Sequence, residues 1–175
     1  MKKNILITGV PGVGKTTLMV KIIEAVKDAG PVGFYTEEIR EKGIRTGFSL
    51  TSATGGQSTL SHVNIRSRFR VGKYGVDVTG LEAFIEQIPF FDETAGMIAI
   101  DEIGRMECFS TKFINLIRDL LDLDKLFVAT IALKGEGLIA EVKRRPDVLL
   151  FEMTMGNRND LLQRILRYAL LKPSR

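Results

Sequence analysis

The chain has 175 residues, of which 45% are hydrophobic and 26% are charged. These proportions are ordinary for a globular protein, and with this length they predict one domain spanning residues 1–175. The net charge of +4 suits an anionic ligand such as a nucleotide, and it also permits binding to nucleic acid. Charge therefore does not choose between these two classes of ligand.

The cysteine content and the hydropathy of the chain limit the cellular compartments in which it is expected. Cys108 is the lone cysteine, so an intramolecular disulfide is excluded and a reducing compartment fits. The apolar run after the basic start Met1-Lys2-Lys3 ends at Thr8, which is too early for a signal peptide. No run approaches the ~20 apolar residues of a membrane span. We therefore expect a cytoplasmic protein that makes no membrane contact.

The first 29 residues contain the most informative motif. An apolar run, Asn4-Ile5-Leu6-Ile7-Thr8, predicts a buried strand. The next eight residues match the phosphate-binding pattern G-x-x-x-x-G-K-[ST], the P-loop, and read Gly9-Val10-Pro11-Gly12-Val13-Gly14-Lys15-Thr16. Apolar residues at helical spacing then predict a helix from Thr17 to Ala29. A chance glycine-rich turn is the alternative, but it would not require all four fixed positions and both flanking elements.

The chemistry of this motif explains its residue types. Glycines allow backbone conformations that side chains forbid, and they let main-chain N–H groups approach phosphate oxygens. The positive end of the following helix points to the same place. We expect Lys15 to reach the β- and γ-phosphates and Thr16 to hold Mg²⁺, with contacts to the nucleotide continuing through Thr17.

The middle of the chain predicts a hairpin inserted among strands and helices. Gly30-Pro31 ends the first helix. Val32–Ile39 and Ile44–Thr51 read as two strands joined by a turn at residues 41–43. Residues 57–69 are polar, and we expect short strands there. Leu81, Phe84, Ile85 and Ile88 then indicate a short helix that ends before Pro89.

The second half alternates regularly. We expect strands at residues 96–101, 126–133 and 148–153. We expect one helix to begin after the N-cap Ser110 and two more at residues 138–145 and 160–171. The last helix should turn Leu161, Leu162, Ile165 and Leu166 inward. This alternation predicts an α/β fold with a mainly parallel sheet flanked by helices, into which the hairpin is inserted.

Two neighbouring acids complete the predicted site. Asp101 closes the apolar run Met97–Ile100, and an acid at that place in P-loop enzymes holds Mg²⁺. Glu102 follows, and a carboxylate there can polarise a water toward the γ-phosphate. A kinase would not need this base, so the pair favours hydrolysis. The alternative is that two acids simply end a strand at the surface.

Cations near the transferred phosphoryl group would stabilise its charge. Four arginines are candidates for this role: Arg105, Arg144, Arg145 and Arg158. For each of them a solvated surface position is the simpler interpretation.

Having reached these residues, we find that the chain resembles the small P-loop nucleoside-triphosphatases first described from hyperthermophiles, which include the human cancer-related nucleoside-triphosphatase. Besides the P-loop, the resemblance rests on residues 33–40 with 47–48, on 71–76, on 101–107 and on Asn157-Arg158. The family usually has Lys where Arg105 stands, and it usually has Asp where Asn159 follows Arg158.

The resemblance implies Mg²⁺-dependent hydrolysis of ATP, GTP, CTP and UTP to diphosphate and phosphate, with broad base tolerance. It implies that another strand, Leu126–Leu133, separates the acid strand from the loop strand. Lys15 and Glu102 are then the catalytic candidates, and Thr16 and Asp101 hold the metal. Nucleotide contacts are expected from residues 9–17, from Arg158 and from the acid strand Ile98-Ala99-Ile100-Asp101-Glu102-Ile103-Gly104-Arg105. We expect a monomer.

Two other functions remain open at this stage. Small P-loop kinases have this size, and a nucleotide or nucleoside kinase would release ADP only when an acceptor is present. A nucleotide-dependent nucleic-acid-binding module would use the basic clusters Arg66-Ser67-Arg68-Phe69-Arg70 and Lys143-Arg144-Arg145, with an affinity that falls steeply with salt.

Overall fold

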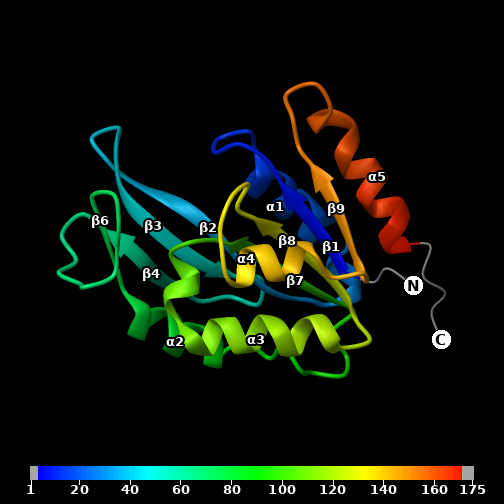
Figure 1. Ribbon diagram of the computed structural model, residues 1–175. Helices are drawn as coiled ribbons and strands as arrows, with labels where there is room; N and C mark the ends of the chain where they lie inside the picture. The colour runs from blue at the N-terminus through cyan, green and yellow to red at the C-terminus, as the bar shows by residue number, and fades with distance from the viewer. Residues whose placement is uncertain (1–3, 171–175) are drawn as a thin grey trace.

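The computed structural model describes residues 4–170, and within them the strands form one mixed sheet (Figure 1). The order across the sheet is β5-β6-β4-β3-β2-β7-β8-β1-β9. The strands are β1 (Asn4–Thr8), β2 (Pro31–Glu41), β3 (Ile44–Ser52), β4 (Gln57–His62), β5 (Arg70–Val71), β6 (Tyr74–Val76), β7 (Met97–Ile103), β8 (Leu126–Ile131) and β9 (Val148–Glu152).

The sheet has a parallel part and an antiparallel extension. Neighbouring strands from β2 through β7, β8 and β1 to β9 are all paired in parallel. The remaining strands are added antiparallel beyond β2. β8 lies between the loop strand β1 and the acid strand β7, which confirms the expected strand order.

Helices cover both faces of the sheet. They are α1 (Lys15–Ala25), α2 (Val78–Glu86), α3 (Thr111–Asp122), α4 (Leu138–Lys143) and α5 (Arg158–Leu170), with 3-10 turns at η1 (Lys27–Ala29) and η2 (Glu107–Phe109). One apolar cluster joins α1 and α5 to the sheet, and another joins α2, α3 and α4 to the opposite face. Figure 1 shows α3 and α5 on different sides of the strands.

Adjacent residues of the parallel strands point to opposite faces of the sheet and pack into the two different apolar clusters. In β1, Leu6 belongs to the α2–α4 side, while Ile5 and Ile7 belong to the α1–α5 side. β7 divides in the same way, with Ile98 and Ile100 on one face and Ala99 on the other. Because side chains alternate across a strand, a strand covered on both faces must be apolar throughout, as these are.

The hairpin expected around residue 43 is confirmed. β2 and β3 pair antiparallel, and the two residues between them, Lys42 and Gly43, have φ angles of 49° and 80°. A two-residue hairpin turn with positive φ at both positions matches the right-handed twist of the strands. β2 leaves its parallel pairing with β7 after Phe34 and continues in the hairpin.

Several predicted boundaries differ from the structure. The first helix was expected to run to Ala29, but α1 ends at Ala25 and the 3-10 turn η1 follows. β7 continues to Ile103, so Asp101 lies inside the strand instead of closing it. Residues 63–69 form turns and irregular backbone where short strands were expected, because polar residues there give no alternating pattern to bury.

The final helix was expected at residues 160–171. α5 begins two residues earlier, at Arg158, and Leu171 lies outside the described residues. Leu161 and Ile165 are buried as expected, while Leu162 and Leu166 are only half-buried. None of the helices within residues 4–170 is both long and apolar enough to be a membrane span.

Phe34 provides a test of the core. Its ring is fully buried in β2 and packs against Phe84 of α2 and Phe113 of α3, with centroids 5.8 and 6.5 Å away. Replacing Phe34 with Ala should lower the free energy of unfolding by about 3–5 kcal/mol. The same change at Phe91, which is 56% exposed, should cost about 0.5 kcal/mol or less. Urea denaturation measures both, and equal losses would contradict this packing.

Candidate active site

The P-loop wraps the carboxyl end of β1 and leads directly into α1. Gly12 and Gly14 have φ angles of 78° and 110°, conformations that residues with side chains rarely adopt. A Cβ on Gly9 would lie 2.6 Å from the carbonyl oxygen of Met153, which no real Cβ tolerates. Val10 and Pro11 are exposed at the tip of the loop, whereas Val13 packs inward. Glycine is therefore required where the loop turns and where it passes β9.

Lys15 folds back over its own loop. Its ammonium group donates to the carbonyl oxygens of Gly9 and Val10, at 3.1 and 3.5 Å. It also lies 3.8 Å from Glu102 Oε2, and its side chain is only 9% exposed. The cation thus lies between the loop and the acids of β7, at the N-terminus of α1 where backbone N–H groups are free to bind an anion.

Asp101 is held by donors from three separate elements. Thr16 Oγ1 of α1 donates to Asp101 Oδ2 at 2.8 Å. Thr36 of β2 donates twice to the same oxygen, from its backbone N–H at 3.2 Å and from its hydroxyl at 3.0 Å. Thr130 of β8 donates to the other oxygen, Oδ1. The carboxylate is 1% exposed, so its orientation is fixed by these four bonds.

Glu102 lies beside Asp101 and faces Lys15. It is half-buried, and this loss of solvation raises the pKa of its carboxyl group, while the positive charge of Lys15 acts in the opposite direction. The negative charge of Asp101 raises the same pKa further, and the positive charge of Lys143 lowers it. Glu102 is therefore a carboxylate with enhanced basicity next to a phosphate-binding loop, as a general base requires.

Glu107, which was not predicted as a site residue, lies close to Glu102. Both carboxyl groups lie against Gly104: a Cβ there would be 2.8 Å from Glu107 Oε2 and 3.0 Å from Glu102 Oε1. Glu107 is 4% exposed, and burial raises the pKa of its carboxyl group to about 8, helped by the negative charge of Glu102. At neutral pH Glu107 is therefore mainly protonated.

Lys143 is a second residue that the sequence did not single out for the site. Its ammonium group donates to the carbonyl oxygens of Ala132 and Leu133, at 2.6 and 2.8 Å, just beyond the carboxyl end of β8. Burial lowers the pKa of Lys143, and the negative charges of Glu102 and Glu152 act against this. It adds positive potential to the acid side of the site.

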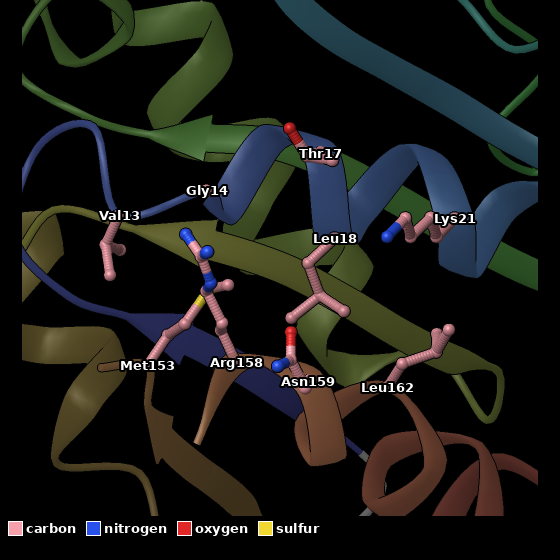
Figure 2. Close-up of a pocket in the computed structure, with 9 residues that line it drawn as sticks. All are labelled: Val13, Gly14, Thr17, Leu18, Lys21, Met153, Arg158, Asn159 and Leu162. Atoms are coloured by element: carbon pink, nitrogen blue, oxygen red, sulfur yellow. The ribbon is translucent and has the colours of Figure 1, made fainter. Parts of the chain in front are cut away.

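A cavity of about 310 Å³ opens on the other side of the P-loop, between α1 and α5. Figure 2 shows the Arg158 guanidinium extending from the start of α5 toward Gly14, while Leu18 and Asn159 approach each other from facing helices. The lining mixes apolar and polar side chains and comprises Val13, Gly14, Thr17, Leu18, Lys21, Met153, Arg158, Asn159 and Leu162. Arg158 is thus brought next to the loop, as the sequence suggested.

The other candidate arginines are placed differently. Arg145 is engaged by Asp122 and Asp147, at 2.7 and 2.9 Å, which holds it in a structural ion-pair network. Arg105 and Arg144 are exposed. Since Lys143 also binds carbonyl oxygens, two of the three residues in the cluster 143–145 are occupied by internal contacts, which argues against a nucleic-acid surface there.

The apolar residues of the acid strand are buried. Ile98, Ala99, Ile100 and Ile103 are all 0% exposed, and Gly104 is buried. Nucleotide contacts from these residues, which the resemblance implied, stay a prediction. Their bulk fills the two cores and fixes the position of Asp101 and Glu102.

Comparison with known proteins gives the family. The model of the NTPase family matches residues 4–166. This match spans almost the whole chain, from the start of β1 into α5. The chain belongs to this NTPase family.

Individual members are similar over nearly their full length. The nucleoside-triphosphatase THEP1 of Thermotoga sp. (strain RQ2) is 42% identical over 164 residues, covering 93% of each chain. The human cancer-related nucleoside-triphosphatase is 40% identical over 178 residues, covering 93% of this chain and 94% of the human one. The resemblance expected from the motifs is thereby confirmed.

Two solved structures share the fold. The crystal structure of THEP1 from Aquifex aeolicus superposes with a TM-score of 0.83 at 39% identity, covering 97% of this chain and 99% of that one. The solution structure of the human cancer-related nucleoside triphosphatase gives a TM-score of 0.82 at 36% identity, covering 98% and 100%. The P-loop NTPase fold predicted from the sequence is therefore confirmed for this family member.

Glu107 gives a pH-dependent prediction. Between its ordinary pKa of 4.5 in the unfolded chain and about 8 in the folded protein, folding takes up a proton. The free energy of unfolding should therefore fall as pH rises through this range, with a contribution of roughly 1 kcal/mol for each pH unit. Glu107→Gln removes the titration, so the stability of this variant relative to wild type should increase from pH 5 to pH 8.

Urea denaturation at pH 5, 6.5 and 8 measures the difference. Glu93→Gln is the matched control, because Glu93 is exposed and its replacement should leave the pH dependence unchanged. A constant difference between Glu107→Gln and wild type across this range would show that Glu107 does not change its ionisation on folding.

Proposed function

We propose that this chain is a Mg²⁺-dependent nucleoside-triphosphatase that hydrolyses nucleoside triphosphates to diphosphate and phosphate. The observation that carries the proposal is the placement of Lys15 and Thr16 of the P-loop directly opposite Glu102 and Asp101 of β7, at 3.8 and 2.8 Å. The names of the relatives, nucleoside-triphosphatases in Thermotoga and in humans, support the same reaction.

The residues present fit a magnesium ion. Thr16 Oγ1 and Asp101 Oδ2 are hard oxygen donors 2.8 Å apart. Adjacent ligands of an octahedral Mg²⁺ with bonds of about 2.0–2.1 Å are about 2.9 Å apart. No group of three or more His, Cys, Asp or Glu within residues 4–170 is arranged to hold a metal, which suits Mg²⁺, since it takes few protein ligands and completes its shell with phosphate and water.

The roles of the chain's own residues follow from their positions. The loop N–H groups and the N-terminus of α1 bind phosphate oxygens, and Lys15 exchanges its carbonyl partners for the β- and γ-phosphates. Thr16 and Asp101 would hold Mg²⁺, which when bound neutralises charge on the phosphates. These groups stabilise the charge that develops as the terminal phosphoryl group is transferred.

Glu102 orients the attacking water. Its carboxylate lies beside Lys15, and therefore near the place where the terminal phosphate would bind. Partial burial makes this carboxylate more basic than one in water, so it is suited to accept a proton from the water as the bond to phosphorus forms. The leaving group is the nucleoside diphosphate, whose new charge Lys15 and the loop amides stabilise.

Broad base tolerance is supported by the lining of the cavity beside the loop. Leu18 and Leu162 offer apolar contact, and Lys21 and Arg158 offer positive charge. Apolar surface and positive charge favour any nucleoside attached to phosphates, and only Thr17 and Asn159 of this lining carry neutral side chains that can hydrogen-bond a base. Arg158, which points toward the loop, suits the ribose or phosphates rather than the base.

Phosphate release from ATP, GTP, CTP and UTP, each with Mg²⁺ and with EDTA, tests this function. We expect release from all four, with kcat/KM values within about tenfold of one another and loss of release in EDTA. ADP formation that requires an added nucleoside or nucleotide would instead identify a kinase and contradict the proposal.

Glu102→Gln tests the hydrolytic role. The amide keeps the size of the side chain but cannot accept the proton, so kcat should fall about 10²- to 10⁴-fold. Nucleotide affinity should stay within about threefold of wild type, because Glu102 does not bind the phosphates. The exposed substitution Glu93→Gln is the control and should leave kcat unchanged. Wild-type turnover in Glu102→Gln would remove Glu102 from the mechanism.

A further inference from the structure

We propose that Thr36 and Thr130 are positioning residues that hold the Asp101 carboxylate in the orientation needed to bind Mg²⁺. This inference rests on the proposed function, because it concerns the metal that Thr16 and Asp101 would hold. Neither threonine belongs to the P-loop or to the acid pair.

Thr36 and Thr130 donate hydrogen bonds to different oxygens of the Asp101 carboxylate. Thr36 donates to Oδ2 through both its N–H and its hydroxyl, and Thr130 donates to Oδ1 through its hydroxyl. Rotation of the carboxylate about its own axis would break bonds to both residues. Oδ2 is therefore kept on the side of Thr16, 2.8 Å from the Thr16 hydroxyl.

The strand order explains why these residues reach Asp101. β2 and β8 are the two neighbours of β7 in the sheet, so each contributes one threonine from its own side. The regular pairing of β2 with β7 ends at Phe34 and Ile100, and the pairing of β8 with β7 is irregular between Ile100 and Ile103. The Thr36 N–H, which is released from the parallel ladder, bonds to the Asp101 side chain instead.

A bound cation would affect the hydrogen bonds of Thr36 and Thr130 differently from the hydrogen bond of Thr16. Thr16, Thr36 and Thr130 together donate four hydrogen bonds to a carboxylate that has about four lone-pair sites, so a cation on Asp101 would take the place of the bond from Thr16. The bonds from Thr36 and Thr130 use other lone pairs of the carboxylate and are compatible with the bound cation. They are outer-shell partners, a class whose removal typically costs 10- to 100-fold in metal affinity.

The test measures nucleotide affinity, not turnover. The dissociation constant of a non-hydrolysable ATP analogue is measured by calorimetry in Mg²⁺ and in EDTA. The value in EDTA divided by the value in Mg²⁺ reports how much the metal strengthens binding. Thr36→Val removes the hydroxyl donor but keeps the size of the side chain and the N–H donor. We expect the ratio to fall at least tenfold from wild type, while affinity in EDTA changes less than twofold. Thr36→Ser should restore the wild-type ratio.

Two further variants complete the design. Thr130→Val should lower the ratio in the same way through the other carboxylate oxygen. Thr46→Val is the matched control, because Thr46 is also half-buried in the hairpin but donates to the carbonyl oxygen of Ile39, away from Asp101. It should leave the ratio unchanged.

The outcomes separate the two proposals. If wild type binds the analogue equally in Mg²⁺ and in EDTA, the proposed metal-dependent function fails and the positioning role fails with it. If wild type shows a large ratio that Thr36→Val retains, only the positioning role is overturned. Equal weakening of Thr36→Val in both conditions would indicate a purely structural role and would also overturn it.

Discussion

The buried carboxylate of Asp101 is the contact on which the site depends. It gathers donors from α1, β2 and β8, and so it fixes the P-loop helix, the hairpin strand and the central strand relative to one another. This arrangement requires β7 to lie between β2 and β8, since only then can both neighbours reach one side chain. The geometry of the phosphate site therefore depends directly on the order of the strands in the sheet.

Buried charges of both signs surround this contact, and burial strengthens the interactions between them. Asp101, Glu102 and Glu107 lie on the acid side, while Lys15 and Lys143 supply the nearby ammonium groups. Protonation of the buried Glu107 relieves part of the repulsion, as its raised pKa shows. With Glu107 protonated, the two carboxylates of Asp101 and Glu102 face the two ammonium groups of Lys15 and Lys143. Mg²⁺ would accompany the triphosphate and offset its negative charge beside these carboxylates.

Sequence reasoning worked where chemistry and pattern are local. The P-loop, the apolar strands and the adjacent acids Asp101 and Glu102 are contiguous motifs, so the α/β fold and the principal site candidates could be predicted from them, whereas the strand order was implied by the resemblance to the family. Thr36, Thr130, Glu107 and Lys143 were missed because only tertiary packing brings them to the site. Thr36 lies in residues 33–40, one of the stretches that carry the family resemblance, but nothing in its type or spacing indicates a role in the site. Lys143 was interpreted as part of a surface cluster of basic residues. The error in α1 was local, since the helical pattern continues through the 3-10 turn η1.

The most direct test of this account is a crystal structure of the chain with a non-hydrolysable triphosphate analogue and Mg²⁺. The account predicts the β- and γ-phosphates within hydrogen-bond distance of Lys15 and the loop N–H groups, with the metal beside Thr16 and Asp101. It also predicts that the Glu102 carboxylate faces the terminal phosphate. A triphosphate bound away from Lys15, or an Asp101 carboxylate that remains remote from the metal, would contradict it.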